Sequence, residues 1–126
     1  DGGIEALIPE LPSRWLLPAH AHSPQLVALM ADMARSVGAR GQFNQQTAML
    51  GRPDSHQDLA KAAIPTLVMC GRQDPVTPVA DHEAMAARVP GSRLAFIEDC
   101  GHLSAIEQPD AVTRVLEDWL DSTQRA

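Results

Sequence analysis

Two short apolar segments, with a helical pattern between them, limit the folds open to this chain more than any other feature. The first, "PTLVMCG", covers residues 65–71, and the second, "RLAFIE", covers residues 93–98. Apolar runs of this length that contain β-branched residues and are bounded by turn-forming residues are typical of buried strands. The sequence therefore predicts two strands at these positions.

A helical pattern follows each predicted strand. Thr77 and Pro78 begin the first helix, which carries apolar residues at helical spacing and ends at "VPGS". Pro109 begins the second helix. The apolar residues of this second helix share one face: Val112, Val115, Leu116, Trp119 and Leu120. The order strand–helix–strand–helix predicts a parallel pair of strands joined by a right-handed crossover, so the fold class is α/β.

The region before the first strand is predicted to be helical. Three prolines break residues 4–22 into short helical turns. A longer helix follows, with Ser23 as a possible cap and Pro24 at its first position, and its apolar residues recur at helical spacing up to Gly38. Residues 39–50 are predicted to form another helix.

The composition excludes several classes of partner. The chain has 126 residues, of which 44% are hydrophobic, and a formal net charge of -6. Nucleic acids and anionic membranes both require a basic surface, so neither is an expected partner. No apolar run approaches the roughly 20 residues of a membrane span.

The start, "DGGIEALIPE", has no signal-peptide pattern and no initial Met, which suggests a processed or truncated chain. Two cysteines are too few for a disulfide framework, so we expect reduced thiols in a cytoplasmic protein.

An acid and a histidine follow the two predicted strands. Asp74 lies just beyond the first strand and His102 just beyond the second. Because the carboxyl ends of parallel strands meet at one edge of a sheet, we expect the two side chains to lie close together. A carboxylate beside a histidine fixes the ring tautomer and stabilises the imidazolium that forms when the other ring nitrogen takes a proton. The pair is therefore a candidate catalytic pair, and the alternative is that each residue only shapes its loop.

At these residues the chain resembles the α/β-hydrolase family. "GRQDPVTP" (71–78) is similar to the segment that carries the acid of that family's triad, and "CGHLSAIEQPDAV" (100–112) is similar to the segment that carries its histidine. The resemblance covers roughly residues 62–121. It implies that Asp74 orients the histidine and that His102 acts as general base and then as general acid.

The resemblance also implies a division of the chain. Residues 1–61 are similar to part of the helical cap that many members of the family carry, and residues 62–126 are similar to the C-terminal part of the core. We therefore expect the C-terminal portion of an α/β-hydrolase fold preceded by a helical cap segment.

The nucleophile of such a hydrolase is not found in the sequence. The family places it on a sharp turn between strand and helix, usually as Gly-x-Ser-x-Gly, and this motif is absent from the 126 residues. Oxyanion donors from an early loop are missing as well. We therefore expect a missing N-terminal part of the hydrolase, or a partner chain, to complete the sheet, and we expect an oligomer because unpaired strand edges favour association.

Four side chains could be imagined as ligands of one metal: Cys70, Asp74, Cys100 and His102. Structural zinc sites usually use Cys-x-x-Cys pairs, whereas single cysteines at strand ends are commonly buried thiols. We therefore predict no metal and no cofactor. The sequence does not decide whether the two cysteines form a disulfide.

Residues outside the acid and histidine positions also have predicted roles. Residues 15–17, Trp-Leu-Leu, either line an acyl pocket or pack the cap on the core. The acidic and amide residues of "EQPDAV", Glu107, Gln108 and Asp110, are predicted to favour the N-terminus of the last helix. The alternative for Glu107 is that it pairs with a nearby backbone group. The remaining histidines are predicted to lie on the surface: His20, His22, His56 and His82.

Two functions follow from these patterns. The first is a hydrolase that acts on a small-molecule substrate, an ester or a related acyl compound, by a Ser-His-Asp mechanism, to which this chain supplies acid and histidine. The second is a non-catalytic, truncated hydrolase-like module that binds a small apolar ligand or a partner chain. A nucleophile of another type, such as aspartate, would indicate dehalogenation or epoxide opening.

Overall fold

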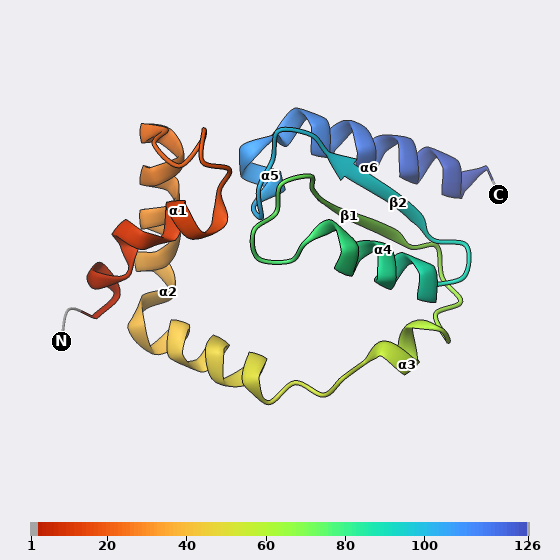
Figure 1. Cartoon of the computed structure of the whole chain (residues 1–126), viewed down its shortest axis with the longest axis horizontal. Helices are drawn as coiled ribbons and strands as arrows, with labels where there is room; N and C mark the ends of the chain where they lie inside the picture. Colours follow the sequence, from red (N-terminus) through yellow and green to blue (C-terminus); the bar gives the residue numbers. More distant parts are fainter. Residues whose placement is uncertain (1–2, 126) are drawn as a thin grey trace.

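The computed structural model describes residues 3–125 and consists of a helical N-terminal region and a C-terminal α/β region (Figure 1). Strands β1 (Leu67–Gly71) and β2 (Arg93–Ile97) form a parallel two-stranded sheet in which Leu67 pairs with Arg93 and Gly71 with Ile97. The prediction of two parallel neighbouring strands is confirmed. Their carboxyl ends lie at the same edge of the sheet.

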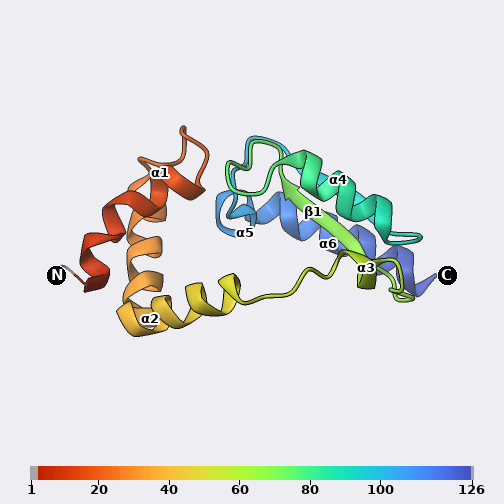
Figure 2. The same cartoon turned by 60° about the horizontal axis from the view of Figure 1, so that its bottom comes forward.

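Helices cover both faces of this sheet. Helix α4 (Val79–Arg88) connects β1 to β2 on one face, and α6 (Pro109–Gln124) follows β2 and lies on the other (Figure 2). Apolar residues of the strands, of the loop after β2 and of α6 form a small core with three buried members: Ile97, Cys100 and Val112. Burial of these side chains stabilises the pairing of strands and helix.

The N-terminal region begins with short helical turns, as predicted from its prolines. These are η1 (Gly3–Ala6), η2 (Ile8–Glu10) and α1 (Leu11–Trp15). Proline has no backbone N–H to donate, so each turn ends after a few residues. The prediction of short turns is confirmed.

Helix α2 (Pro24–Leu50) consists of two helical segments that meet at Gly38. The backbone there has φ of 68° and ψ of 169°, a conformation that favours glycine, and the helix bends at this point (Figure 1). The predicted break is confirmed. Pro24 occupies the first helical position as expected, but Ser23 does not cap the helix, because its hydroxyl donates to the side chain of Gln25.

Two short helices were not predicted, α3 (His56–Leu59) and α5 (Ser104–Glu107). Each has four residues, which is too short for apolar periodicity to reveal it. Among the residues that the structure describes, no helix combines the length and the apolar character that crossing a membrane requires. The division of the chain into cap and core after residue 61 stays a prediction.

Candidate active site

The loops that follow β1 and β2 are bound to each other beyond the sheet. The N–H of Arg72 donates to the carbonyl of Ile97 at 2.8 Å, and the N–H of Gln73 donates to the carbonyl of Cys100 at 3.0 Å. The N–H of Cys100 donates in turn to Oε1 of Gln73, also at 3.0 Å. The pairing of the strands therefore continues into the loops that carry the acid and the histidine.

The carboxylate of Asp74 is buried at this edge, with 2% of its side chain exposed. Its Oδ1 accepts hydrogen bonds from the N–H groups of Val76 at 2.8 Å and Thr77 at 2.9 Å. Its Oδ2 accepts one from the Thr77 hydroxyl at 2.8 Å, and Nδ1 of His102 lies 2.8 Å from the same oxygen. Both oxygens thus have two donors.

These contacts decide the charge of Asp74. Burial by itself raises the pKa of the carboxyl group, but the hydrogen bonds from Thr77, His102 and Val76 outweigh burial and lower the pKa below its ordinary value. The carboxylate is therefore ionised at neutral pH. An ionised acid beside a histidine favours the tautomer with its proton on Nδ1 and leaves Nε2 free to accept one.

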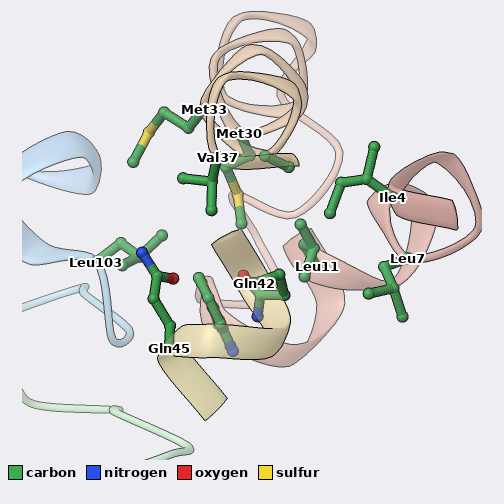
Figure 3. Close-up of a pocket in the computed structure, with 11 residues that line it drawn as sticks. Ile4, Leu7, Leu11, Met30, Met33, Val37, Gln42, Gln45 and Leu103 are labelled. Carbon is green, nitrogen blue, oxygen red and sulfur yellow. The ribbon is translucent and has the colours of Figure 1, made fainter. Parts of the chain in front are cut away.

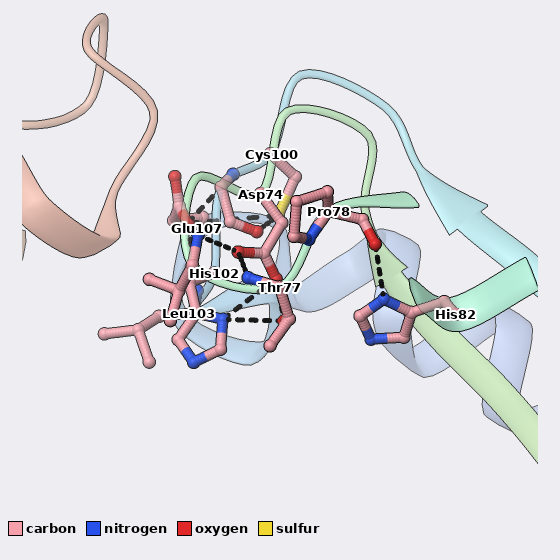
Figure 4. Close-up of polar contacts among 10 residues, drawn as sticks. Asp74, Thr77, Pro78, His82, Cys100, His102, Leu103 and Glu107 are labelled. Carbon is pink, nitrogen blue, oxygen red and sulfur yellow. Dashed lines mark hydrogen bonds and ion pairs between the residues drawn. The ribbon is translucent and has the colours of Figure 1, made fainter. Parts of the chain in front are cut away.

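The imidazole of His102 is partly open to solvent, with 32% of the side chain exposed. One ring nitrogen faces Asp74 and Thr77, and the other points away from them (Figure 4). Trp15 holds the residue from the other side: its carbonyl accepts the N–H of His102 at 2.7 Å, and its ring packs edge-on against the imidazole, with centroids 6.3 Å apart. The geometry suits proton transfer at Nε2.

An apolar pocket of about 230 Å³ lies beside the histidine, between its loop and the N-terminal helices. Leu103, the residue after His102, forms one side of the pocket, and residues of η1, α1 and α2 form the other sides (Figure 3). The apolar residues that line it are Ile4, Leu7, Leu11, Trp15, Met30, Met33, Ala34, Val37 and Leu103. Of residues 15–17, Trp15 thus faces the pocket, while Leu16 is buried with 1% exposure.

Both cysteines are free and buried. Burial, followed by the negative charges of Glu107 and Asp74, raises the pKa of the Cys100 thiol to about 12, and burial likewise raises the pKa of Cys70. Both thiols are therefore protonated at neutral pH, whereas nucleophilic cysteines are thiolates. Within residues 3–125, no three His, Cys, Asp or Glu side chains are grouped so that they could hold a metal ion.

The remaining histidines differ in their surroundings. His22 and His56 are exposed, as predicted, and His82 is half-buried with its Nδ1 3.3 Å from the carbonyl oxygen of Pro78. His20 is also half-buried: its Nδ1 lies 3.0 Å from Oε2 of Glu107, and its side chain is 26% exposed. The surface prediction is therefore wrong for His20 and His82.

Asp110 lies in the first turn of α6, as predicted, but neither Glu107 nor Gln108 caps this helix with its side chain. For Glu107 the alternative, pairing with nearby backbone groups, is the one found. Glu107 is the last residue of α5, and its buried carboxylate accepts hydrogen bonds from the loop around His102 and from Leu17. The side chain of Gln108 donates to the carbonyl of Asp99 at 2.9 Å instead of capping α6. Sequence reasoning missed the contacts of Glu107 with Leu17 and His20 and also the contacts of Thr77, because no sequence pattern identifies these partners.

The chain is similar to several hydrolases of known name. It is 31% identical to 3-oxoadipate enol-lactonase 2 of Acinetobacter baylyi over 118 residues, which cover 93% of this chain and 43% of that protein. It is also 31% identical to the poly(3-hydroxyalkanoate) depolymerase of Ectopseudomonas oleovorans, over 90% of this chain and 44% of that protein. The chain thus spans less than half the length of these relatives.

A solved structure gives the same result for the fold. The thermophilic esterase of Thermogutta terrifontis superposes with a TM-score of 0.86 at 31% identity, over 93% of this chain and 43% of the esterase chain. The model of the alpha/beta hydrolase family matches residues 2–115. With this match and these relatives, the chain belongs to the alpha/beta hydrolase family.

Proposed function

We propose that the protein is a hydrolase of an ester or a related acyl substrate, in which Asp74 orients the histidine and His102 is the general base and then the general acid. The observation that carries this proposal is the 2.8 Å contact between Nδ1 of His102 and Oδ2 of the buried Asp74. The other ring nitrogen, Nε2, points away from this contact (Figure 4). A reacting group would have to lie on that side of the ring.

The proposed reaction moves one proton back and forth through Nε2 of His102. The imidazole takes the proton of the nucleophile as the nucleophile attacks the acyl carbon, and the imidazolium gives this proton to the oxygen of the leaving group. In the second half, His102 takes a proton from water, which attacks the acyl group, and returns it to the nucleophile. Asp74 stays ionised throughout and stabilises the imidazolium.

The nucleophile is proposed to come from outside these 126 residues. The sequence contains no Gly-x-Ser-x-Gly motif, and the raised pKa values of Cys70 and Cys100 make either thiol a poor nucleophile at neutral pH. We propose a serine on a strand-to-helix turn of a further part of the protein, with the oxyanion donors beside it. The Ser-His-Asp mechanism rests on this proposal.

Two observations support an acyl substrate. The apolar pocket beside His102 has room for a hydrocarbon chain; its lining is aliphatic, thioether and aromatic except for Gln42 and Gln45. The similar proteins are named as an enol-lactonase, a depolymerase of a polyester and an esterase, and these names support an ester as the bond that is cleaved.

We also propose that further polypeptide pairs with the open edges of the sheet, either another part of the same protein or a partner chain in an oligomer. Apolar side chains of the α/β region are exposed, among them Val76, Met85, Leu116 and Leu120. Both the unpaired edges of the two-stranded sheet and these exposed apolar side chains favour association. The two buried free cysteines support a reducing, cytoplasmic location as a further proposal.

The test is hydrolysis of p-nitrophenyl esters by the full-length protein. We expect turnover that His102→Ala reduces to the background, because the variant has no proton acceptor. His22→Ala, which changes an exposed histidine, should hydrolyse the esters as the unmodified protein does. If the unmodified protein binds a fatty acid in the pocket but hydrolyses no ester, the protein is a binding module and the proposal is wrong.

A further inference from the structure

A second buried carboxylate lies close to the Asp74–His102 pair. The side chain of Glu107 has no exposed surface, and Figure 4 shows it close to His102 and Leu103. Both of its oxygens accept hydrogen bonds. A buried carboxylate without partners is strongly unfavourable, so these donors are what permits an acidic residue here. The donors come from two segments that are far apart in the sequence.

Oxygen Oε1 of Glu107 binds the backbone on both sides of the histidine. It accepts hydrogen bonds from the N–H of Gly101 at 3.1 Å and from the N–H of Leu103 at 3.2 Å. The N–H of His102, which lies between them, donates to the carbonyl of Trp15 at 2.7 Å. Three consecutive N–H groups are thus fixed, and with them the backbone from which the imidazole projects.

Oxygen Oε2 of Glu107 binds the N-terminal region. It accepts a hydrogen bond from the N–H of Leu17 at 2.8 Å, and Nδ1 of His20 lies 3.0 Å away. The two backbones are in close contact here, since a Cβ atom on Gly101 would lie 2.6 Å from the nitrogen of Leu17. One carboxylate therefore joins residues 15–20 to the loop of the histidine.

We propose that Glu107 is a positioning residue for His102, and that it makes the orientation of the imidazole depend on the docking of residues 15–20. The proposal rests on the proposed function, in which His102 is the general base. Trp15 lines the pocket and also accepts the N–H of His102, so the segment that Glu107 holds in place belongs to both the pocket and the histidine.

The chemistry of this site requires a carboxylate. Three of the donors are backbone N–H groups, those of Leu17, Gly101 and Leu103, and a backbone N–H can only donate. A glutamine side chain has nearly the same shape but only one acceptor oxygen, and its NH₂ group would face at least one of these N–H groups. Glu107→Gln therefore breaks the link to one of the two segments and leaves an N–H without a partner.

The first test compares the kinetics of Glu107→Gln with those of the full-length protein, using a p-nitrophenyl ester. We expect kcat to fall by about 100-fold, since displacement of a catalytic group by about 1 Å has an effect of this size. KM should change less than kcat, because Glu107 does not itself line the pocket and Trp15 is the one pocket-lining residue of the segment 15–20 that it holds. The matched control is Glu98→Gln, which removes an exposed carboxylate paired with Arg72 and should leave kcat unchanged.

The second test is independent of the nucleophile. The proton between Nδ1 of His102 and Asp74 should give a strongly deshielded NMR signal, which His102→Ala removes. We expect Glu107→Gln to weaken or broaden this signal and Glu98→Gln to preserve it. A purely structural role for Glu107 would leave the signal of a folded variant unchanged.

The third test examines the N-terminal side of the link. His20→Ala removes the side chain that lies against Oε2 of Glu107, whereas the side-chain nitrogen of His20→Asn can occupy nearly the same position as Nδ1. We expect kcat to fall in His20→Ala and to be largely restored in His20→Asn. The two His20 variants also test the positioning role of Glu107 if Glu107→Gln does not fold. Equal kcat values in both variants and in the unmodified protein would then contradict the proposal.

The outcomes separate this proposal from the proposed function. If Glu107→Gln folds and keeps both kcat and the NMR signal while Asp74→Asn is inactive, the positioning role is wrong and the hydrolase proposal stands. If Asp74→Asn and His102→Ala keep full turnover, the hydrolase mechanism is wrong. In that case the NMR signal alone decides whether Glu107 positions the histidine.

Discussion

Nδ1 of His102 lies 2.8 Å from Oδ2 of Asp74, although 28 residues of sequence separate the two side chains. The parallel pairing of β1 and β2 brings them together, because it places the loops after both strands at one edge of the sheet. The loops are then bound to each other through Arg72, Gln73 and Cys100. The pair is thus a product of the sheet topology, and its chemistry can be tested without disturbing the fold.

Asp74→Asn should reduce turnover by orders of magnitude in the full-length protein and leave folding nearly intact. The amide oxygen can still accept the N–H groups of Val76 and Thr77, which preserves the loop. The amide nitrogen would donate to Nδ1 of His102, which favours the wrong tautomer and no longer stabilises the imidazolium. In a serine protease the analogous change lowers kcat by about 10⁴-fold. Here ester hydrolysis measures the loss of turnover, and circular dichroism measures whether the variant is folded.

The control for this prediction is Asp81→Asn. Asp81 is an exposed acid in the first turn of α4, beyond the loop that holds Asp74. Its substitution should leave turnover unchanged. Full turnover in Asp74→Asn together with loss of turnover in Asp81→Asn would mean that the wrong acid has been assigned.

Thr77→Val should make the protein less stable near neutral pH by about 1.5 kcal/mol, the size of a hydrogen bond to a charged group. The Thr77 hydroxyl donates to Oδ2 of Asp74 and helps to lower the pKa of that carboxyl, although burial opposes it. Without the hydroxyl, this pKa moves closer to its value in the unfolded chain. Urea unfolding measures the loss, and Thr113→Val, on the exposed face of α6, is the control.

The pH dependence of this effect has a definite sign. Because folding lowers the pKa of Asp74, its contribution to stability is complete above the pKa of an unfolded aspartate, about 3.9. The contribution is lost as the pH falls below that value through the folded pKa. The difference in stability between Thr77→Val and the unmodified protein should therefore shrink below about pH 4, and a difference that grows in acid would contradict the assignment.

Much of the fold can be predicted from local patterns. The two apolar runs predict β1 and β2, Pro24 predicts the start of α2, and Gly38 predicts the bend inside it. The contact between Asp74 and His102 follows from these strands and a general rule about parallel sheets. The predictions of the strands, the helix start and the bend each depend on a few residues that are adjacent in the sequence. The prediction of the Asp74–His102 contact depends on the strand–helix–strand order, which those local predictions determine.

The contacts of Glu107 could not be predicted in the same way. Its partners Leu17 and His20 are 90 and 87 residues away in the sequence. Three of its hydrogen bonds come from backbone N–H groups, which every residue except proline supplies. An acid just before proline suggests a helix N-terminus by its local sequence. The structure overrides that local preference because the carboxylate is buried between two segments that only the tertiary fold brings together.

Neither cysteine should react with a maleimide in the native protein at neutral pH. Burial raises the pKa of Cys70, and burial with the nearby acids raises that of Cys100 to about 12, so both are protonated as well as inaccessible. Mass spectrometry should find both labelled only after denaturation in urea. Ser122→Cys introduces an exposed thiol and should be labelled at once, whereas rapid native labelling of Cys100 would contradict the burial of this loop.

A fluorophosphonate should label the full-length protein at a serine outside the 126 residues. Tryptic mapping of the labelled protein locates the site, and Asp74→Asn should slow labelling because the histidine then activates the nucleophile poorly. Labelling at any of the serines of this chain, at a rate well above that of free serine, would refute the proposal that the nucleophile lies elsewhere. Those serines are Ser13, Ser23, Ser36, Ser55, Ser92, Ser104 and Ser122.

Ala34→Leu should change the preference of the protein for the length of the acyl chain. Ala34 lines the pocket of about 230 Å³, and leucine adds the bulk of an isopropyl group to it while suiting a helix equally well. We expect kcat/KM for a long-chain p-nitrophenyl ester to fall by at least about tenfold, because a mismatch of one methylene in an apolar pocket has an effect of this size. The kcat/KM for p-nitrophenyl acetate should not change. Ala28→Leu, on the exposed side of the same helix, should change neither. Equal losses for both esters would show that the acyl chain binds elsewhere.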